Sequence, residues 1–298
     1  MKKILFKIFL ISCLFFLLPH THTVSAQGDT TEIRRMLEEG ITRLNNNELR
    51  EAVQVLDRGR DMLHKMVIEL DERNQNIIRS NQLTREAENL IHQGNHDGAL
   101  DLLNEAIELN LNNIEAYKFR GSIRLIQEQQ IERSRDRDYI GLINDYTNAV
   151  RIADRRIAAT PRNSQERKEL EKERAKILIN RAYVKLQSGR NPGFYSAIED
   201  YNDAIRNDDQ NWDGFLGRAV AHHLIKDYRR EVNDYLKAIE LMQKYEHRMT
   251  DDEWGNLYLT VAIAYASLRD GRNAYEYATR AYNLGNADAE RIMQRNRP

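Results

Sequence analysis

Polar and apolar residues follow one another in the same order at three places along the chain. The segments LINDYTNAV (142–150), SAIEDYNDAI (196–205) and EVNDYLKAIE (231–240) each contain Asp-Tyr-x-x-Ala followed by Ile or Val. Tyr201 and Tyr235 are 34 residues apart. Self-similarity at a fixed period is typical of proteins that stack one supersecondary unit many times. The pattern therefore predicts an array of similar units.

The clearest unit, from Ser80 to Asn113, indicates what each unit is. It has a glycine, Gly94, at its centre, and small residues on both sides at Ala87, Ala99 and Ala106. Two antiparallel helices approach closely only where their side chains are small, so the pattern predicts a helical hairpin that turns at Gly94. One hairpin cannot bury its apolar faces alone, and the hairpins must therefore stack. This unit resembles the tetratricopeptide repeat (TPR), whose period is about 34 residues.

The resemblance sets a register for the whole chain. The first small position of each hairpin, in its first helix, is Gly40, Ala87, Gly121, Ala182, Ala219 and Ala262. The third small position, in the second helix, is Gly59, Ala106, Ala149, Ala204, Ala238 and Ala281. The second small position, between them, is Ala52, Ala99, Ala197 and Ala274, but Leu142 and Glu231 in hairpins three and five. We expect six hairpins, at 33–66, 80–113, 114–156, 175–211, 212–245 and 255–288, and a short capping helix within 289–298.

The predicted fold is therefore all-α, a right-handed solenoid of about six TPR hairpins over residues 33–298. Only 4 prolines interrupt the chain, which suits helices. Residues 67–79 are compatible with a helix, and two charged insertions, 127–138 and 157–174, predict longer helices or projecting loops. Each charged run is interpreted first as a solvated helix face and second as a contact for a partner.

The first 26 residues have the layout of a secretory signal peptide. Lysines precede an apolar run from Ile8 to Leu18, Pro19 ends the run, and Val24-Ser25-Ala26 offers small residues for cleavage. Residues 27–32 are expected to form a tail before the first hairpin. The sequence thus predicts an exported, periplasmic protein of bacterial type. As an alternative, Leu10-Ile11-Ser12-Cys13 resembles a lipobox that would anchor the protein to a membrane through Cys13.

Charge and motifs narrow the function. Acidic and basic residues are interspersed with a net charge of −1, so no basic face for nucleic acid is indicated. The chain lacks the motifs of serine hydrolases, zinc proteases, phosphate-binding loops and dinucleotide sites. His92 and His96 are four residues apart, but Gly94 lies between them at the expected turn, which disfavours a shared metal ion. We expect no enzyme activity, no cofactor and no metal site.

Two recurring residue types predict structure within hairpins three to five. The tyrosines Tyr146, Tyr201 and Tyr235 fall in the middle of the second helices and are expected to pack in the core. An arginine precedes the first small position in the same hairpins that carry the Asp-Tyr motif. These residues predict three ion pairs across the hairpins, Arg120–Asp145, Arg181–Asp200 and Arg218–Asp234.

The resemblance also implies where a partner binds, because TPR arrays use a concave groove lined by their first helices. It places ten residues there: Lys118, Lys176, Ile179, Asn180, Tyr183, Leu216, Val220, His223, Leu259 and Ile263. The groove is polar toward the N-terminus and apolar toward the C-terminus. An apolar peptide or lipid-like ligand would fit the apolar half, but curvature or the capping helix would instead bury it. Lys118 and Asn180 match the TPR clamp for a C-terminal carboxylate, whereas Asp213 would repel one.

Three functions are compatible with the sequence. The first is a non-catalytic adaptor that binds a protein or peptide in the groove. The second is a ligand-binding component that works beside a transport system, and the third is a scaffold of the cell envelope that associates with itself. Only the likeness in fold supports the second function.

Overall fold

The computed structural model describes residues 24–130, 139–189, 191–245 and 247–297. Over these residues it has twelve helices and no strand, so the predicted all-α class is confirmed. The helices are α2 (Val24–Asn45), α3 (Leu49–His92), α4 (His96–Leu109), α5 (Ile114–Gln130), α6 (Tyr139–Ala159), α7 (Gln165–Gln187), α8 (Asn191–Asn207), α9 (Trp212–Leu224), α10 (Tyr228–Lys244), α11 (Asp251–Ser267), α12 (Gly271–Asn283) and α13 (Ala289–Arg295).

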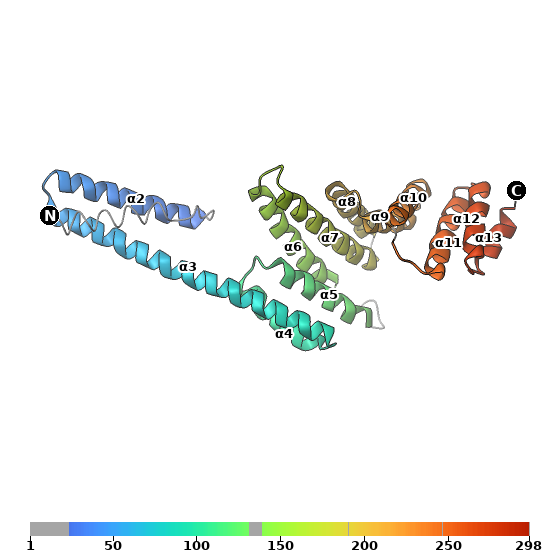
Figure 1. The fold of residues 1–298 in the computed structure, drawn as a ribbon, viewed down its shortest axis with the longest axis horizontal. Helices are drawn as coiled ribbons and strands as arrows, with labels where there is room; N and C mark the ends of the chain where they lie inside the picture. The colour runs from blue at the N-terminus through green and yellow to red at the C-terminus, as the bar shows by residue number, and fades with distance from the viewer. Residues whose placement is uncertain (1–23, 131–138, 190, 246, 298) are drawn as a thin grey trace. The chain divides into compact units, whose positions relative to one another are not determined.

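The chain divides into two units, with the boundary between Ile78 and Arg79. In the first unit, α2 packs along the first half of α3 (Figure 1). The contact depends on small residues, as the sequence predicts: a Cβ added to Gly40 would lie 2.7 Å from Leu56 Cδ2. Ile33 and Ala52 are buried in this unit.

The long helix α3 combines the second helix of the first hairpin with the first helix of the second. Its 44 residues include 67–79, which contain neither glycine nor proline and so offer no reason for a break. The expected tail, residues 27–32, is helical as well and belongs to α2. A helix continues there because its one glycine, Gly28, costs only about 1 kcal/mol relative to alanine. The predicted signal segment up to residue 23, with Cys13, lies outside the described residues.

In the second unit the helices pair as consecutive hairpins, and six of these helices begin with a side-chain cap. Asn95, Ser164, Asn211, Asp227 and Asp270 accept a hydrogen bond from a backbone N–H in the first turn of α4, α7, α9, α10 and α12. Thr250 and Glu253 form a reciprocal capping box at the start of α11. Gly94, at the predicted turn, has a φ of 77°, a conformation that glycine adopts at little cost.

A buried polar cluster joins α3, α4 and α5. The Asn113 amide nitrogen donates to Ser80 Oγ and Thr84 Oγ1, both at 2.9 Å, and its oxygen accepts from the Ala116 amide. Ser80 Oγ donates in turn to the Ala106 carbonyl at 2.6 Å. These bonds satisfy groups that burial would otherwise leave unpaired, and they fix the end of hairpin two against the start of hairpin three.

The recurring tyrosines lie in the core, where the sequence places them. Tyr146, Tyr201 and Tyr235 are at most 4% exposed. Burial raises the pKa of Tyr201. Tyr201 packs so closely on α9 that a Cβ added to Gly217 would lie 2.4 Å from its Cζ. This glycine lets the ring of one hairpin rest on the backbone of the next.

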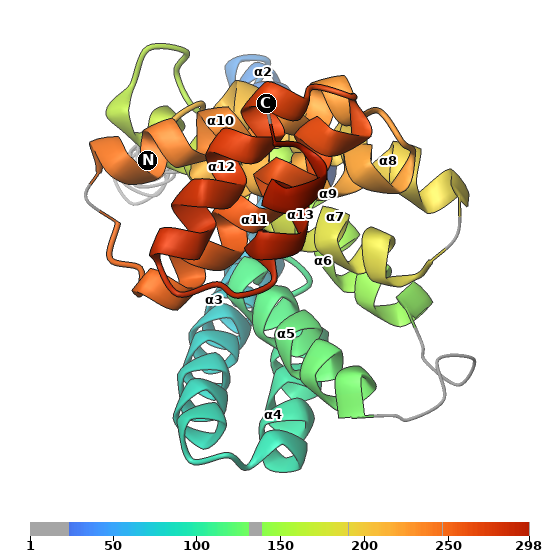
Figure 2. The same ribbon diagram turned by 90° about the vertical axis from the view of Figure 1, so that its right-hand side faces the viewer.

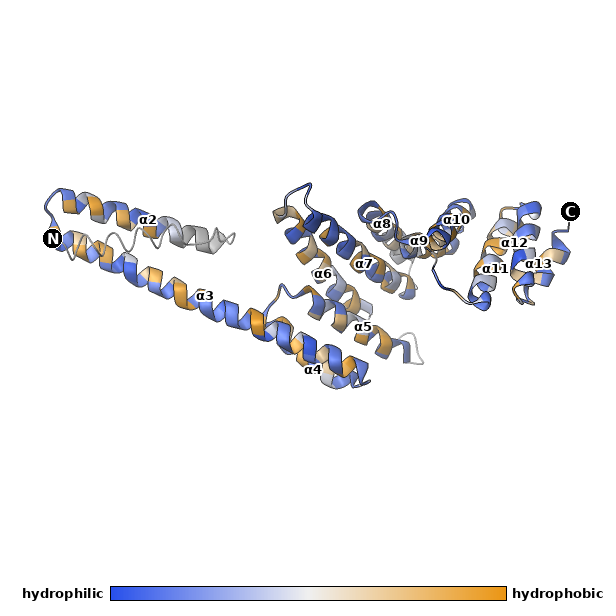
Figure 3. Ribbon diagram, in the orientation of Figure 1, coloured by the Kyte–Doolittle hydropathy of each residue, from blue (hydrophilic) through white to orange (hydrophobic). Residues whose placement is uncertain are grey.

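The two charged insertions, 127–138 and 157–174, and the C-terminal helix also belong to the second unit. Residues 127–130 extend α5, and the rest of the first charged insertion, 131–138, lies outside the described residues. In the second insertion α6 ends before Pro161, and α7 begins with a hydrophilic stretch that is visible in Figure 3. The last helix, α13, contacts α11 and α12 and buries Ala289 against them (Figure 2).

Candidate functional site

The three predicted arginine–aspartate pairs are formed, and each is bidentate. The Nη2 to Oδ1 distances are 2.6 Å for Arg120–Asp145, 2.7 Å for Arg181–Asp200 and 2.7 Å for Arg218–Asp234. In each pair Nε also donates to the carboxylate. The aspartate side chains are 9% exposed or less, so the bonds lie where water screens them weakly.

A second basic residue joins each pair, one helical turn after the arginine. Arg124 Nη1 lies 2.8 Å from Asp145 Oδ2, and Lys185 Nζ lies 2.6 Å from Asp200 Oδ2. The equivalent residue in hairpin five is His222, whose Nε2 is 3.7 Å from Asp234 Oδ2. We did not predict these members from the sequence, although a basic residue four positions after each arginine was the available signal.

The same arginines also connect neighbouring hairpins. The Nη1 atoms of Arg120, Arg181 and Arg218 donate to a side chain on the second helix of the preceding hairpin, at 2.8, 3.3 and 2.7 Å. The acceptors, in that order, are Asn104, Thr147 and Asn202. The arginine therefore fixes its own hairpin and the register between hairpins.

Hairpin six has no such ion cluster. Val261, Tyr265 and Tyr277 occupy the equivalent positions, and the two tyrosine rings stack with their centroids 5.5 Å apart. The Arg280 guanidinium lies over Tyr277, 4.6 Å from the ring centroid. Aromatic packing thus replaces ion pairing at this end of the array.

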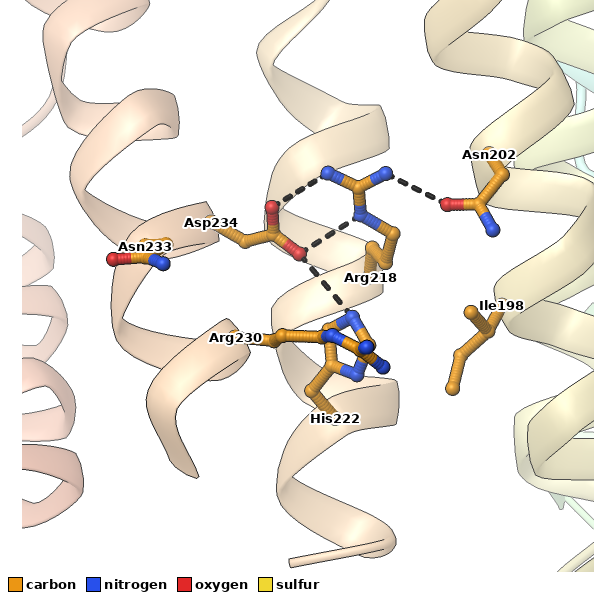
Figure 4. Close-up of a pocket in the computed structure, with 7 residues that line it drawn as sticks. All are labelled: Ile198, Asn202, Arg218, His222, Arg230, Asn233 and Asp234. Carbon is orange, nitrogen blue, oxygen red and sulfur yellow. Dashed lines mark hydrogen bonds and ion pairs between the residues drawn. The ribbon is translucent and has the colours of Figure 1, made fainter. Parts of the chain in front are cut away.

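A cleft of about 480 Å³ opens beside the Arg218 cluster, between α8, α9 and α10 (Figure 4). Figure 4 shows Arg218 between Asp234 on one side and Asn202 on the other. His222 Nδ1 is buried without a hydrogen-bond partner, and burial lowers the pKa of this histidine. Because Arg218 already donates to both neighbours, its charge is committed to holding the helices together.

The residues predicted to line the groove differ in their exposure. Tyr183, Val220 and Ile263 occupy the same register on α7, α9 and α11, and their exposed fractions are 39%, 40% and 40%. We call these three residues the apolar stripe. Ile179, Leu216 and Leu259, one turn earlier, are half-buried and pack against the cores between helices. The apolar half of the predicted groove is therefore partly exposed and partly buried in the core.

The polar half of the predicted set is also divided. Lys118 Nζ lies 2.7 Å from Glu115 and 3.4 Å from Glu173, so its charge is neutralised within the protein. Lys176 and Asn180 are exposed on α7. The exposed members of the predicted set thus lie on α7, α9 and α11 rather than on α5.

His223, the last predicted groove residue, hydrogen-bonds to a buried acid that we did not assign a role from the sequence. Its Nδ1 is 3.1 Å from Glu231 Oε1, and its side chain is 50% exposed while that of Glu231 is 1% exposed. Glu231 Oε2 is buried and has no hydrogen-bond partner. Burial raises the pKa of Glu231, and His223 opposes this rise. The substitution of Glu231 for a small residue was the signal that could have found this pair.

A second cleft, of about 640 Å³, lies near the C-terminal end. It is lined by Gln243, Trp254, Tyr258, Arg280, Asn283 and Leu284, and the rings of Trp254 and Tyr258 stack 5.6 Å apart. Within the part of the chain that the structure describes, no group of three or more His, Cys, Asp or Glu residues could hold a metal ion. None of the helices so described is long and apolar enough to cross a membrane.

Comparison with known proteins identifies the fold. No protein-family model matches the chain, and no curated protein matches its sequence. YrrB, a TPR protein with an unusual peptide-binding site, matches with a TM-score of 0.50 and 12% identity, over 72% of this chain and 89% of YrrB. PilF of Pseudomonas aeruginosa gives 0.50 and 13% over 90% and 97%. Acl4, an assembly chaperone of RpL4, gives 0.51 and 11% over 89% and 95%. The chain therefore has a TPR fold, built as a solenoid of helical hairpins.

Proposed function

We propose that the chain is a non-catalytic adaptor that binds a peptide segment of a partner protein along the apolar stripe. The observation that carries this proposal is the exposure of Tyr183, Val220 and Ile263 at one register of three successive first helices. A fold that needed these positions only for packing would bury them, as it buries Ala182, Ala219 and Ala262 beside them. Side chains presented at regular intervals suit a peptide that contacts several hairpins in turn.

The ion clusters support the proposal because they hold the first helices in place. Each arginine bonds to its own hairpin and to the preceding one, so the first helices of hairpins three to five keep a fixed spacing. A pre-organised surface loses less conformational entropy when it binds a flexible segment. The N-terminal segment further supports an exported protein that meets this partner in the periplasm, or at a membrane if Cys13 is lipidated.

The second cleft favours one other function, the binding of a small apolar ligand. Its stacked Trp254 and Tyr258 offer an aromatic wall, and Gln243, Arg280 and Asn283 offer polar groups at its edge. This combination suits a ligand with a flat apolar body and a few polar substituents.

Site-specific cross-linking in the cells of origin tests the adaptor. A photo-reactive amino acid is placed at Val220 and, as a matched control, at Glu240, which is exposed on the second helix α10. We expect Val220 to cross-link a discrete protein and Glu240 not to do so. Equal labelling from both positions, or none from Val220, would contradict the proposal. A bound small molecule in native mass spectrometry, lost in Trp254→Ala, would favour the ligand instead.

A further inference from the structure

His223 and Glu231 form a polar pair that packing does not explain. The register places alanine at the position of Glu231 in four other hairpins, at Ala52, Ala99, Ala197 and Ala274. All four alanines are fully or almost fully buried. Glu231 puts a carboxyl group into the same kind of site and leaves one oxygen, Oε2, without a hydrogen-bond partner. Such a group destabilises a fold, so its presence at this position points to a function.

The His223–Glu231 pair lies next to the surface that is formed by the first helices. His223 lies in the last turn of α9 and Glu231 in the first turn of α10. The pair occupies His223 Nδ1, so Nε2 is the ring nitrogen left for a ligand, and half of the side chain is exposed. The Tyr228 ring meets the imidazole edge-on, with the ring centroids 6.1 Å apart. His223 follows Val220 by one helical turn and thus adjoins the apolar stripe.

The protonation chemistry makes Nε2 a hydrogen-bond donor. If the pair is ionised, histidine is an imidazolium and both ring nitrogens carry protons. If the proton instead stays on Glu231, the glutamic acid donates to Nδ1, and the imidazole proton is on Nε2. Only a third state, with a buried carboxylate and a neutral histidine, would make Nε2 an acceptor, and it leaves a buried charge uncompensated. The helix dipoles favour the ionised form, because they attract positive charge to the end of α9 and negative charge to the start of α10.

Resting on the proposed adaptor function, we propose that His223, oriented by Glu231, donates a hydrogen bond from Nε2 to a carboxylate of the bound peptide. A carboxylate is the acceptor that an imidazolium binds best, because both partners of the bond are charged. The peptide would then combine apolar residues, which contact the stripe, with an acidic group placed beside Val220. Glu231 is a positioning residue, since it acts through His223.

The experiment uses the full chain and two random peptide libraries, one displayed internally and one with free C-termini. Peptides selected on the wild-type protein are synthesised with their acid and with the matching amide, and their dissociation constants are measured by fluorescence polarisation. We expect the acid to bind about ten- to a hundredfold more tightly than the amide, and His223→Ala to abolish the difference. Enrichment in the internal library would identify an acidic side chain, and enrichment in the other a C-terminal carboxylate.

Glu231 variants separate positioning from folding. In Glu231→Gln the neutral amide can no longer pair with an imidazolium or donate a carboxyl proton to Nδ1, so the preference for the acid should fall or be lost. The imidazole ¹⁵N chemical shifts of His223 report its protonation and tautomer directly. Glu240→Gln, on the exposed face of the same helix, is the matched control and should leave binding unchanged. Glu231→Ala should lose the preference while the protein unfolds at an equal or higher denaturant concentration.

The outcomes distinguish this inference from the adaptor function. If the wild-type protein selects no peptides, or if Val220→Lys does not weaken their binding, the adaptor function itself fails. If peptides bind along the stripe but acid and amide bind equally, or if His223→Ala keeps the preference, the carboxylate site is refuted and the adaptor function stands.

Discussion

Loss of the arginine should destabilise hairpin five more than hairpins three and four, because the three ion clusters differ in their second basic residue. In Arg181→Ala the Asp200 carboxylate keeps Lys185 at 2.6 Å, and in Arg120→Ala Asp145 keeps Arg124 at 2.8 Å. In Arg218→Ala, Asp234 retains only His222 at 3.7 Å.

The burial of each aspartate and the presence of a second cation determine how much stability each arginine variant loses. The Asp234 side chain is 9% exposed, and an uncompensated charge at such a site costs about 3–5 kcal/mol. Where a second cation remains, the loss is that of charge-assisted hydrogen bonds, about 1.5–3 kcal/mol. We therefore expect Arg218→Ala to lower the free energy of unfolding by about 1–2 kcal/mol more than either other variant.

Urea unfolding, followed by circular dichroism, measures the total effect, and hydrogen exchange resolved to single helices assigns it to α9. Helix resolution is needed because the hairpins of a solenoid can unfold separately. The matched rescue is Arg218→Ala combined with His222→Lys, which supplies the ammonium that Lys185 provides in hairpin four. Equal losses in the three hairpins, or a double variant no more stable than Arg218→Ala, would refute this reasoning.

Three further predictions concern single sites. Burial lowers the pKa of His222 below its ordinary value of 6.5, so the unfolded chain binds more protons there. Stability should therefore decline as the pH falls below 6.5, and His222→Lys should flatten that part of a curve of urea midpoint against pH. Gly217→Ala should lower the free energy of unfolding by about 1–3 kcal/mol in thermal unfolding, because the added Cβ would overlap Tyr201. Gly59→Ala should not destabilise the protein, because its Cβ would lie 3.6 Å from Met36 Cβ, at an ordinary contact distance. Asn113→Ala should cost about 2–4 kcal/mol by urea unfolding, since it removes a cap and leaves buried hydroxyls unpaired, and a loss below about 0.5 kcal/mol would contradict this role.

The sequence predicted those structural features whose residues recur in several hairpins. The spacing of small residues predicted helical hairpins, and the repeated Arg and Asp positions predicted the three ion pairs, because a contact made in several hairpins leaves the same residues at the same register. The second basic residues were missed because they change from Arg124 to Lys185 to His222 and so do not repeat as one residue type.

Contacts that are made only once leave no repeated residue pattern, so the sequence did not predict them. The Asn113 cluster joins residues up to 33 positions apart and, among the residues that the structure describes, occurs at one junction. The continuity of α3 depends on the absence of a break, and a missing break leaves no repeated residue in the sequence. Glu231 was visible as an exception to the register, but its partner was not, because its contact with His223 depends on how α9 and α10 meet.

Hairpin five contains two departures from the repeat, and they have a consequence for its dynamics. Glu231 replaces alanine, and His222 replaces the arginine or lysine that completes the other ion clusters. Both changes should weaken the attachment of α9 to α10, because one buries an incompletely paired acid and the other places a histidine 3.7 Å from Asp234 in place of a close cation. Functional surfaces are often drawn from the less stable parts of a fold. We therefore expect amides of α9 to exchange faster than those of α7 in native-state hydrogen exchange, and His222→Lys with Glu231→Ala to bring the two helices to similar protection. Protection in α9 that already equals that of α7 would show that these departures do not loosen the hairpin.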